Sequence, residues 1–131
     1  MKKNFVVEDA CALVCGDIVY EVCHFNRLRE ISVRSNGVVQ ILIDPSPEYR
    51  DRGRALLLHF EAVSFFEIRG LTKFEFFHNI NEIGYMPSSQ DHDDYLVAEE
   101  HASPDDHFAM RVSDGYLRIY AESATLCARS S

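Results

Sequence analysis

The side chains best suited to chemistry in this sequence are histidines and carboxylates that lie between residues 91 and 107. Three groups could offer ligands to a divalent transition metal: His92 with Asp93 and Asp94, His101, and His107 with Asp105 and Asp106. Imidazole and carboxylate together suit such metals. However, no H-x-x-x-H or H-E-x-x-H pattern is present, and the stretch from Asp91 lacks the acid spacing and central glycine of an EF-hand loop. We therefore predict no metal and no cofactor.

Four cysteines are the other candidates for metal or redox chemistry. Cys11 and Cys15 are four residues apart, Cys23 follows, and Cys127 is isolated near the end. Zinc sites usually show two closely spaced pairs, so the spacing favours buried structural cysteines over metal ligands. Glu8 interrupts the N-terminal apolar run too early for an export signal. We expect a cytoplasmic protein with reduced thiols.

No motif places a nucleophile beside a base. The patterns G-x-S-x-G, G-x-G-x-x-G and the P-loop are absent. Cys23 and His24 are adjacent, but neighbours on an expected strand point to opposite faces. Two carboxylates at a suitable separation in space could still support glycosidase-type chemistry. An enzyme is therefore the less favoured class, although the sequence leaves it open.

The negative charge is concentrated in one segment. The formal net charge is −8, and no Lys or Arg occurs between Lys73 and Arg111. The candidate partner-binding residues in this segment are Asp91, Asp93, Asp94, Glu99, Glu100, Asp105 and Asp106. An electronegative surface steers a basic protein partner, whereas nucleic acid requires a basic stripe and is not expected. The other interpretation is a solvated loop and an exposed edge strand kept soluble by charge.

The elements that position these groups are expected to be strands. Residues 107–112 and 116–121 alternate in hydrophobicity around Ser113-Asp114-Gly115, which predicts a β-hairpin. Residues 28–34 and 38–44 flank Ser35-Asn36-Gly37 and predict a second hairpin, ended by Pro45 and Pro47. These two hairpins are the strongest local signals in the sequence.

The remaining segments give weaker patterns. The apolar run 55–66 suggests a strand buried on both faces and continued over 64–68, and further strands are expected at 73–77 and 80–86. Val7, Cys11, Val14, Cys15 and Ile18 fit one helical face, with a strand after Gly16. We expect a single domain over residues 1–131 that is mainly β, either an antiparallel β-sandwich or a strongly curved antiparallel sheet, with one short N-terminal helix. The longest apolar runs are too short to span a membrane.

Residues 24–122 resemble small bacterial proteins of the YxiG-like and related immunity-protein type. The resemblance lies in the segments CHFNRLREISV, GVVQILID, LLLHFEAVSFFEI and FAMRVSDGYLRIYAES, with an L-x-F-x-x-V run at Leu58, Phe60 and Val63. It implies a non-catalytic protein that neutralises a toxin encoded by a neighbouring gene, and it transfers no catalytic residues.

These observations favour a non-catalytic interaction module, of immunity type, that uses an acidic face against a basic partner. The alternative is a small-ligand-binding protein or minor enzyme with a pocket between the sheet and the helix.

Overall fold

The computed structural model describes residues 1–51, 54–70, 78–90, 95–113 and 115–129. In chain order the elements are β1 (Lys2–Lys3), β2 (Val6–Glu8), β3 (Ala12–Cys15), β4 (Ile18–Glu21), α1 (Val22–Phe25), β5 (Asn26–Val33), β6 (Val39–Pro45), η1 (Pro47–Tyr49), β7 (Leu56–Arg69), β8 (His78–Met86), η2 (Glu99–His101), β9 (His107–Val112) and β10 (Gly115–Ala128). The fold is thus mainly β, as the sequence predicts.

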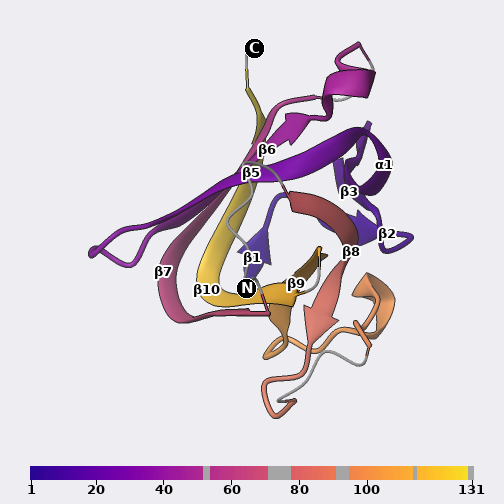
Figure 1. Cartoon of the computed structure of the whole chain (residues 1–131). Helices are drawn as coiled ribbons and strands as arrows, with labels where there is room; N and C mark the ends of the chain where they lie inside the picture. Colours follow the sequence, from indigo (N-terminus) through magenta and orange to yellow (C-terminus); the bar gives the residue numbers. More distant parts are fainter. Residues whose placement is uncertain (52–53, 71–77, 91–94, 114, 130–131) are drawn as a thin grey trace.

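The main sheet closes into a six-stranded antiparallel barrel. Its strands follow the order β10-β7-β6-β5-β8-β9, and β9 pairs again with β10. The short β1 adds to β10 in parallel, and β2, β3 and β4 form a separate three-stranded sheet beside α1 (Figure 1). Of the two predicted architectures, the sandwich is therefore wrong, and the antiparallel sheet curves until it closes. Closure is decided by the pairing between β8 and β9, which joins the two halves of the sheet and gives β9 a partner on each side.

Both predicted hairpins are confirmed. In the first, Val33 pairs with Val39 around Ser35-Asn36-Gly37, where Gly37 has a φ of 80°. In the second, Gly115 pairs with Val112, so this glycine belongs to the strand and not to the loop. A Cβ on Gly115 would collide with the carbonyl oxygen of Arg69 on β7. Glycine is therefore required there by close backbone packing.

The two longest strands, β7 and β10, bend together around one end of the barrel (Figure 1). Their register shifts between Tyr120 and Ala121, and Ala62 on the opposite strand has a φ of 53°. A bulge of this kind bends a strand and increases its twist. The expectation that β7 is buried on both faces is wrong. Leu56, Leu58 and Phe60 are buried, whereas the residues between them are partly exposed, as on a strand with one inward face.

The N-terminal segment departs most from prediction. The helix expected before Gly16 is absent, because the described residues form β2 and β3 there, and the short α1 comes later. The strand expected after Gly16 is present as β4. Asp9 and Ala10 have positive φ values of 52° and 61°, which reverse the chain between β2 and β3 and which a right-handed helix cannot contain. Val7 and Leu13 pair across this turn and enter the barrel core. Of the five residues with helical spacing only Val7 is buried, so the spacing does not mark one buried face.

The expected strand at 80–86 is present within β8, and the one at 73–77 lies outside the described residues. Among the residues that the structure describes, no helix is long and apolar enough to cross a membrane.

Candidate functional site

The second half of the acidic segment is fixed to the outer side of β8. Tyr85 and Val97 exchange two backbone hydrogen bonds, with N···O distances of 2.9 and 2.7 Å. The neighbouring Gly84 permits this approach, because a Cβ at that position would lie 2.9 Å from the Val97 carbonyl oxygen. Residues 95–106 are thus attached to the barrel through specific backbone contacts, and the side chains that follow Val97 have defined positions.

Glu99 connects this segment to three other strands. Its Oε1 accepts hydrogen bonds from the Val7 N–H at 2.9 Å and from the Tyr85 hydroxyl at 2.6 Å. Its Oε2 accepts a hydrogen bond from Lys3 Nζ at 2.9 Å, and this ammonium lies 4.9 Å from the centre of the Tyr85 ring. One carboxylate therefore ties η2 to β1, β2 and β8.

The ionisation of this cluster follows from its contacts. Burial raises the pKa of Glu99, but the hydrogen bonds from Tyr85, Val7 and Lys3, together with the charge of Lys3, outweigh burial and hold the pKa below its usual range. Burial first, and then the bond to the Glu99 carboxylate, raise the pKa of Tyr85. At neutral pH the cluster therefore contains a carboxylate, an ammonium and a neutral phenol.

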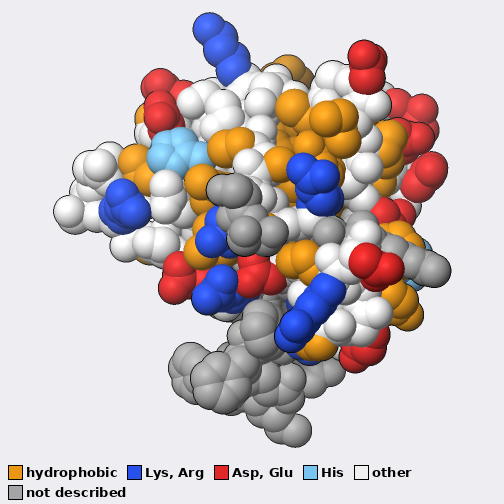
Figure 2. All heavy atoms as spheres, turned by 90° about the horizontal axis from the view of Figure 1, so that it is seen from above, with side chains coloured by type: hydrophobic (Ala, Val, Ile, Leu, Met, Phe, Trp, Pro, Cys, Tyr) orange, Lys and Arg blue, Asp and Glu red, His pale blue; other side chains and the backbone are white. Residues whose placement is uncertain are grey.

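A groove of about 500 Å³ lies beside this cluster, between the N-terminal strands and η2. Its apolar lining includes Val6, Ile83 and Leu96. Its acidic rim, as we call it, consists of Glu8, Asp9 and Glu100, which are all exposed. Figure 2 shows Asp and Glu side chains beside hydrophobic ones along the side of the molecule on which Figure 1 places β2 and β3. The groove thus combines apolar walls with negative charge.

A smaller cavity of about 270 Å³ lies on the other side of Glu99. Its lining includes Lys3, Tyr85 and Asp106. The polar groups of Lys3, Tyr85 and Glu99 already bind one another, so this cavity offers a ligand few uncommitted partners. Neither of these two cavities is lined by α1, and a pocket between sheet and helix stays a prediction.

Of the predicted partner-binding residues, the four that the structure describes have different surroundings. Asp91, Asp93 and Asp94 lie outside the described residues. Glu99 is turned inward and Glu100 outward into the acidic rim. The remaining two are Asp105, which is exposed, and Asp106, whose carboxylate accepts the Ser103 N–H at 2.9 Å and lines the smaller cavity.

The sequence does not identify Glu8 and Asp9 as site residues, because they lie in the segment whose spacing favours a helix. They reach the groove because β2 ends at Glu8 and the chain reverses at Asp9. An alternating strand followed by an acidic turn is a sequence signal that could have identified Glu8 and Asp9 as exposed acids. Only the fold places them on the same groove as Glu100, about 90 residues away in the sequence.

Of the three histidines considered as metal ligands, His92 lies outside the described residues, and the other two have the following contacts. His101 is exposed, with its Nε2 3.7 Å from Glu100. His107 is buried, and its Nδ1 accepts a hydrogen bond from Arg118 Nε at 3.0 Å. Burial and then the charge of Arg118 lower the pKa of His107. A neutral imidazole whose Nδ1 faces a guanidinium is poorly placed to bind a cation.

Arg118 itself positions residues 87–90, which follow β8. It is only 2% exposed, and it donates hydrogen bonds to the backbone carbonyl oxygens of Pro87, Ser88 and Gln90. Its guanidinium also lies 5.2 Å from the centre of the Phe65 ring. This buried cation therefore holds the chain after β8 against the outside of the barrel.

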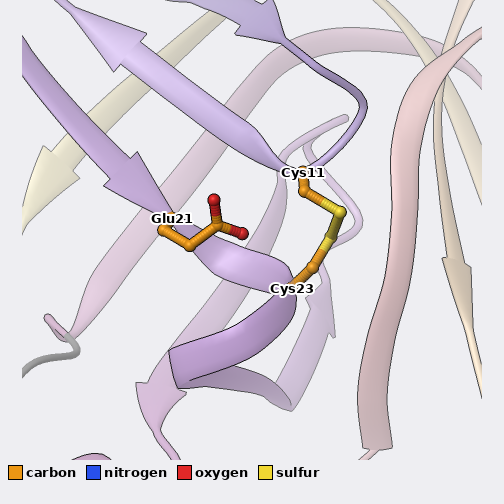
Figure 3. Close-up of side chains that lie close together, drawn as sticks. All are labelled: Cys11, Glu21 and Cys23. Atoms are coloured by element: carbon orange, nitrogen blue, oxygen red, sulfur yellow. A yellow bond between two sulfur atoms is a disulfide. The ribbon is translucent and has the colours of Figure 1, made fainter.

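A second group of chemically active side chains consists of Cys11, Cys23 and Glu21 (Figure 3). Cys11 and Cys23 form a disulfide, with their Cα atoms 5.1 Å apart, whereas Cys15 and Cys127 are free. The expectation of four reduced thiols is thus wrong for this pair. Within the described part of the chain, Cys11, Cys23 and Glu21 also form the one group of three potential metal ligands whose donor atoms lie within 4.8 Å of one another. The expectation that Cys23 and His24 lie on a strand is also wrong, because both belong to α1.

No protein-family profile, curated protein or solved structure matches this chain significantly. The resemblance to YxiG-like and immunity proteins therefore stays a prediction, and no family can be assigned.

Proposed function

We propose that this protein is an interaction module that binds a basic polypeptide segment in the groove between β2 and η2. The observation that carries the proposal is the acidic rim of Glu8, Asp9 and Glu100 around an apolar lining. A segment with an apolar side chain for the groove and lysine or arginine on either side would complement both features.

The charge pattern selects the class of partner. Exposed carboxylates repel phosphate groups, which argues against nucleic acid, and they attract ammonium and guanidinium groups. The groove walls come from β2, β8 and the segment fixed by Glu99, so the site is held by pairing and hydrogen bonds before any partner arrives. Preorganisation of this kind lowers the entropic cost of binding.

A peptide titration would test this proposal. The probe is a fluorescent peptide with a central leucine flanked by lysines, and binding is followed by anisotropy at low and high salt. Comparison peptides replace the lysines with glutamate or the leucine with glycine. We expect the triple variant Glu8→Gln/Asp9→Asn/Glu100→Gln to weaken binding roughly tenfold, since three exposed ion pairs of about 0.5 kcal/mol each sum to about 1.5 kcal/mol. Asparagine suits position 9, where φ is 52°.

A matched control removes the same charge elsewhere. Glu30, Glu48 and Glu122 are exposed and lie outside the groove lining. Their triple change to glutamine should reduce binding much less than the rim variant. Equal weakening by the two variants would mean that net charge alone attracts the peptide, and retention of binding by the rim variant would rule out the groove.

The resemblance to immunity-type proteins supports a narrower form of the proposal, in which the basic partner is a toxin encoded by a neighbouring gene. Co-expression should then rescue growth, and the rim variant should rescue it less than the Glu30/Glu48/Glu122 control. Full rescue by the rim variant would separate toxin neutralisation from the groove.

A further inference from the structure

We infer that Cys11, Cys23 and Glu21 form a thiol-dependent Zn²⁺ site that the disulfide closes and reduction opens. This inference is independent of the proposed function. The three residues come from three neighbouring elements: the turn before β3, the first turn of α1 and the last position of β4 (Figure 3).

The backbone holds these residues together without help from the disulfide. Ala12 pairs with Glu21 across β3 and β4, and the Val22 N–H donates a hydrogen bond to the Cys11 carbonyl oxygen at 2.9 Å. Ala12 and Val22 are also buried, at 5% and 0% exposed. The positions of the two cysteines and the glutamate are therefore fixed by strand pairing and core packing, and they should persist when the sulfur–sulfur bond is broken.

The donor set suits zinc. Two thiolates and a carboxylate are ligands that Zn²⁺ binds in proteins, at about 2.3 Å from sulfur and about 2.1 Å from oxygen. Tetrahedral geometry at those lengths separates donor atoms by about 3.4–3.8 Å. The three donor atoms already lie within 4.8 Å of one another, so small side-chain rotations are sufficient.

A fourth group lies beside the carboxylate. His24 Nδ1 is 3.0 Å from Glu21 Oε1, and the His24 side chain is 71% exposed. His24 thereby orients the Glu21 carboxylate, as hydrogen-bond partners around a metal site orient the metal ligands in zinc proteins. Water would complete the coordination, or the exposed imidazole would rotate to bind the ion directly.

The surroundings of Cys11 and Cys23 accommodate both the disulfide and the two free thiols. Cys11 Sγ lies 3.7 Å from the Asn81 carbonyl oxygen, and Cys23 Sγ lies 3.7 Å from the Ala10 carbonyl oxygen. After reduction each thiol therefore has an acceptor for its hydrogen. Both cysteines are half-buried, which leaves access for a reductant and for an ion.

The chemistry balances with a dithiol as reductant. The dithiol is oxidised to its disulfide, and its two electrons and two protons pass to the sulfur atoms of Cys11 and Cys23. Zn²⁺ then displaces both thiol protons to solvent and binds two thiolates and the Glu21 carboxylate. Binding is accordingly expected to release two protons per ion and to strengthen as the pH rises.

The test compares oxidised and reduced protein with the metal alone. The chain is reduced with excess dithiol, desalted without oxygen, and titrated with Zn²⁺ or with Co²⁺, whose thiolate charge-transfer absorption reports sulfur ligation. We expect the reduced protein to bind one equivalent and the oxidised protein none. Changing Cys11→Ser or Cys23→Ser should weaken Zn²⁺ binding at least 100-fold, and Glu21→Gln roughly 10-fold or more.

The control is the double variant Cys15→Ser/Cys127→Ser, which removes the two free thiols and should leave affinity and cobalt absorption unchanged. The inference is overturned if this control loses binding, if the oxidised protein binds equally well, or if Glu21→Gln has no effect. Circular dichroism is recorded throughout. If reduction unfolds the chain, Zn²⁺ should restore the strand signal in wild type but not in Cys11→Ser/Cys23→Ser, and failure to do so also overturns the inference.

Discussion

Replacing Glu99 with glutamine tests whether this acid supports the fold or serves a partner. The carboxylate accepts hydrogen bonds from Val7, Tyr85 and Lys3, and the side chains of Glu99 and Lys3 are only 27% and 13% exposed. Glutamine keeps one oxygen for the Val7 and Tyr85 donors. Its amide nitrogen then faces the Lys3 ammonium, which loses its acceptor.

The magnitude follows from those contacts. A hydrogen bond to a charged group contributes about 1.5–3 kcal/mol and a neutral one about 1 kcal/mol, so losing the Lys3 bond and weakening the other two should lower the free energy of unfolding by roughly 2–3 kcal/mol. With an unfolding entropy of about 2.1 cal/mol/K per residue, 131 residues give a melting-temperature change of about 4 °C per kcal/mol, or roughly 7–11 °C here.

Urea unfolding followed by circular dichroism measures this change, and Glu100→Gln is the matched control. Glu100 is the next residue, carries the same charge and is exposed, so its substitution should change stability by less than about 0.5 kcal/mol. Peptide affinity should show the reverse order, because Glu100→Gln should weaken peptide binding directly, more than Glu99→Gln does. Equal stability of the two variants would refute the assignment of Glu99 to the scaffold.

The pH dependence gives a second check on Glu99. Because its pKa is lowered in the folded state, its contribution to stability is present above the ordinary value of 4.5 and is lost as pH falls through the folded pKa. The Glu99→Gln variant should therefore show a smaller loss of stability than wild type below about pH 4.5. Parallel pH profiles for the two proteins would contradict the cluster as described.

Three further predictions concern the scaffold. Arg118→Met should lower the free energy of unfolding by about 3 kcal/mol in urea titrations, because it leaves several carbonyl oxygens without their buried donor; a change under about 1 kcal/mol would contradict this. The pKa of His107 is lowered in the folded state, so its contribution to the free energy of unfolding should be present above the ordinary value of 6.5 and lost as pH falls through the folded pKa. Over that pH window, the urea midpoint of His107→Gln should decline less than the midpoint of wild type. Gly115→Ala should lower the free energy of unfolding by about 1–3 kcal/mol, because its Cβ would collide with Arg69. Gly16→Ala is the comparison: there is open space around Gly16, so only its positive φ should lower stability, by about 1 kcal/mol. Equal melting temperatures for the two variants would argue against the close approach of Gly115 to Arg69.

Local pattern was sufficient to predict the two hairpins. Asn36-Gly37 and the Ser113-to-Gly115 loop lie between runs whose alternation has the period of a strand, and a turn with its two flanking strands is encoded within about twenty residues. The same reasoning failed before Gly16, because the helical spacing of Val7, Cys11 and Val14 arises from two short strands and the turn that joins them.

The positions of the charged residues in the sequence also located the excess of negative charge, but they could not assign roles to the individual acids. Glu99 and Glu100 are adjacent and chemically identical, yet the first binds Lys3 and Tyr85 and the second faces solvent. That difference depends on which way each side chain points from η2, which no local pattern specifies.

By itself, then, the sequence determined a strand-rich chain with two defined hairpins and an acidic segment, because turns, alternation and charge are properties of neighbouring residues. Tertiary structure decided the closure of the barrel, the placement of Glu8 and Glu100 along one groove and the pairing of Cys11 with Cys23. These contacts join segments that strand pairing brings together only after the chain has folded. Their partners are set by register and core packing, which are collective properties of the whole chain.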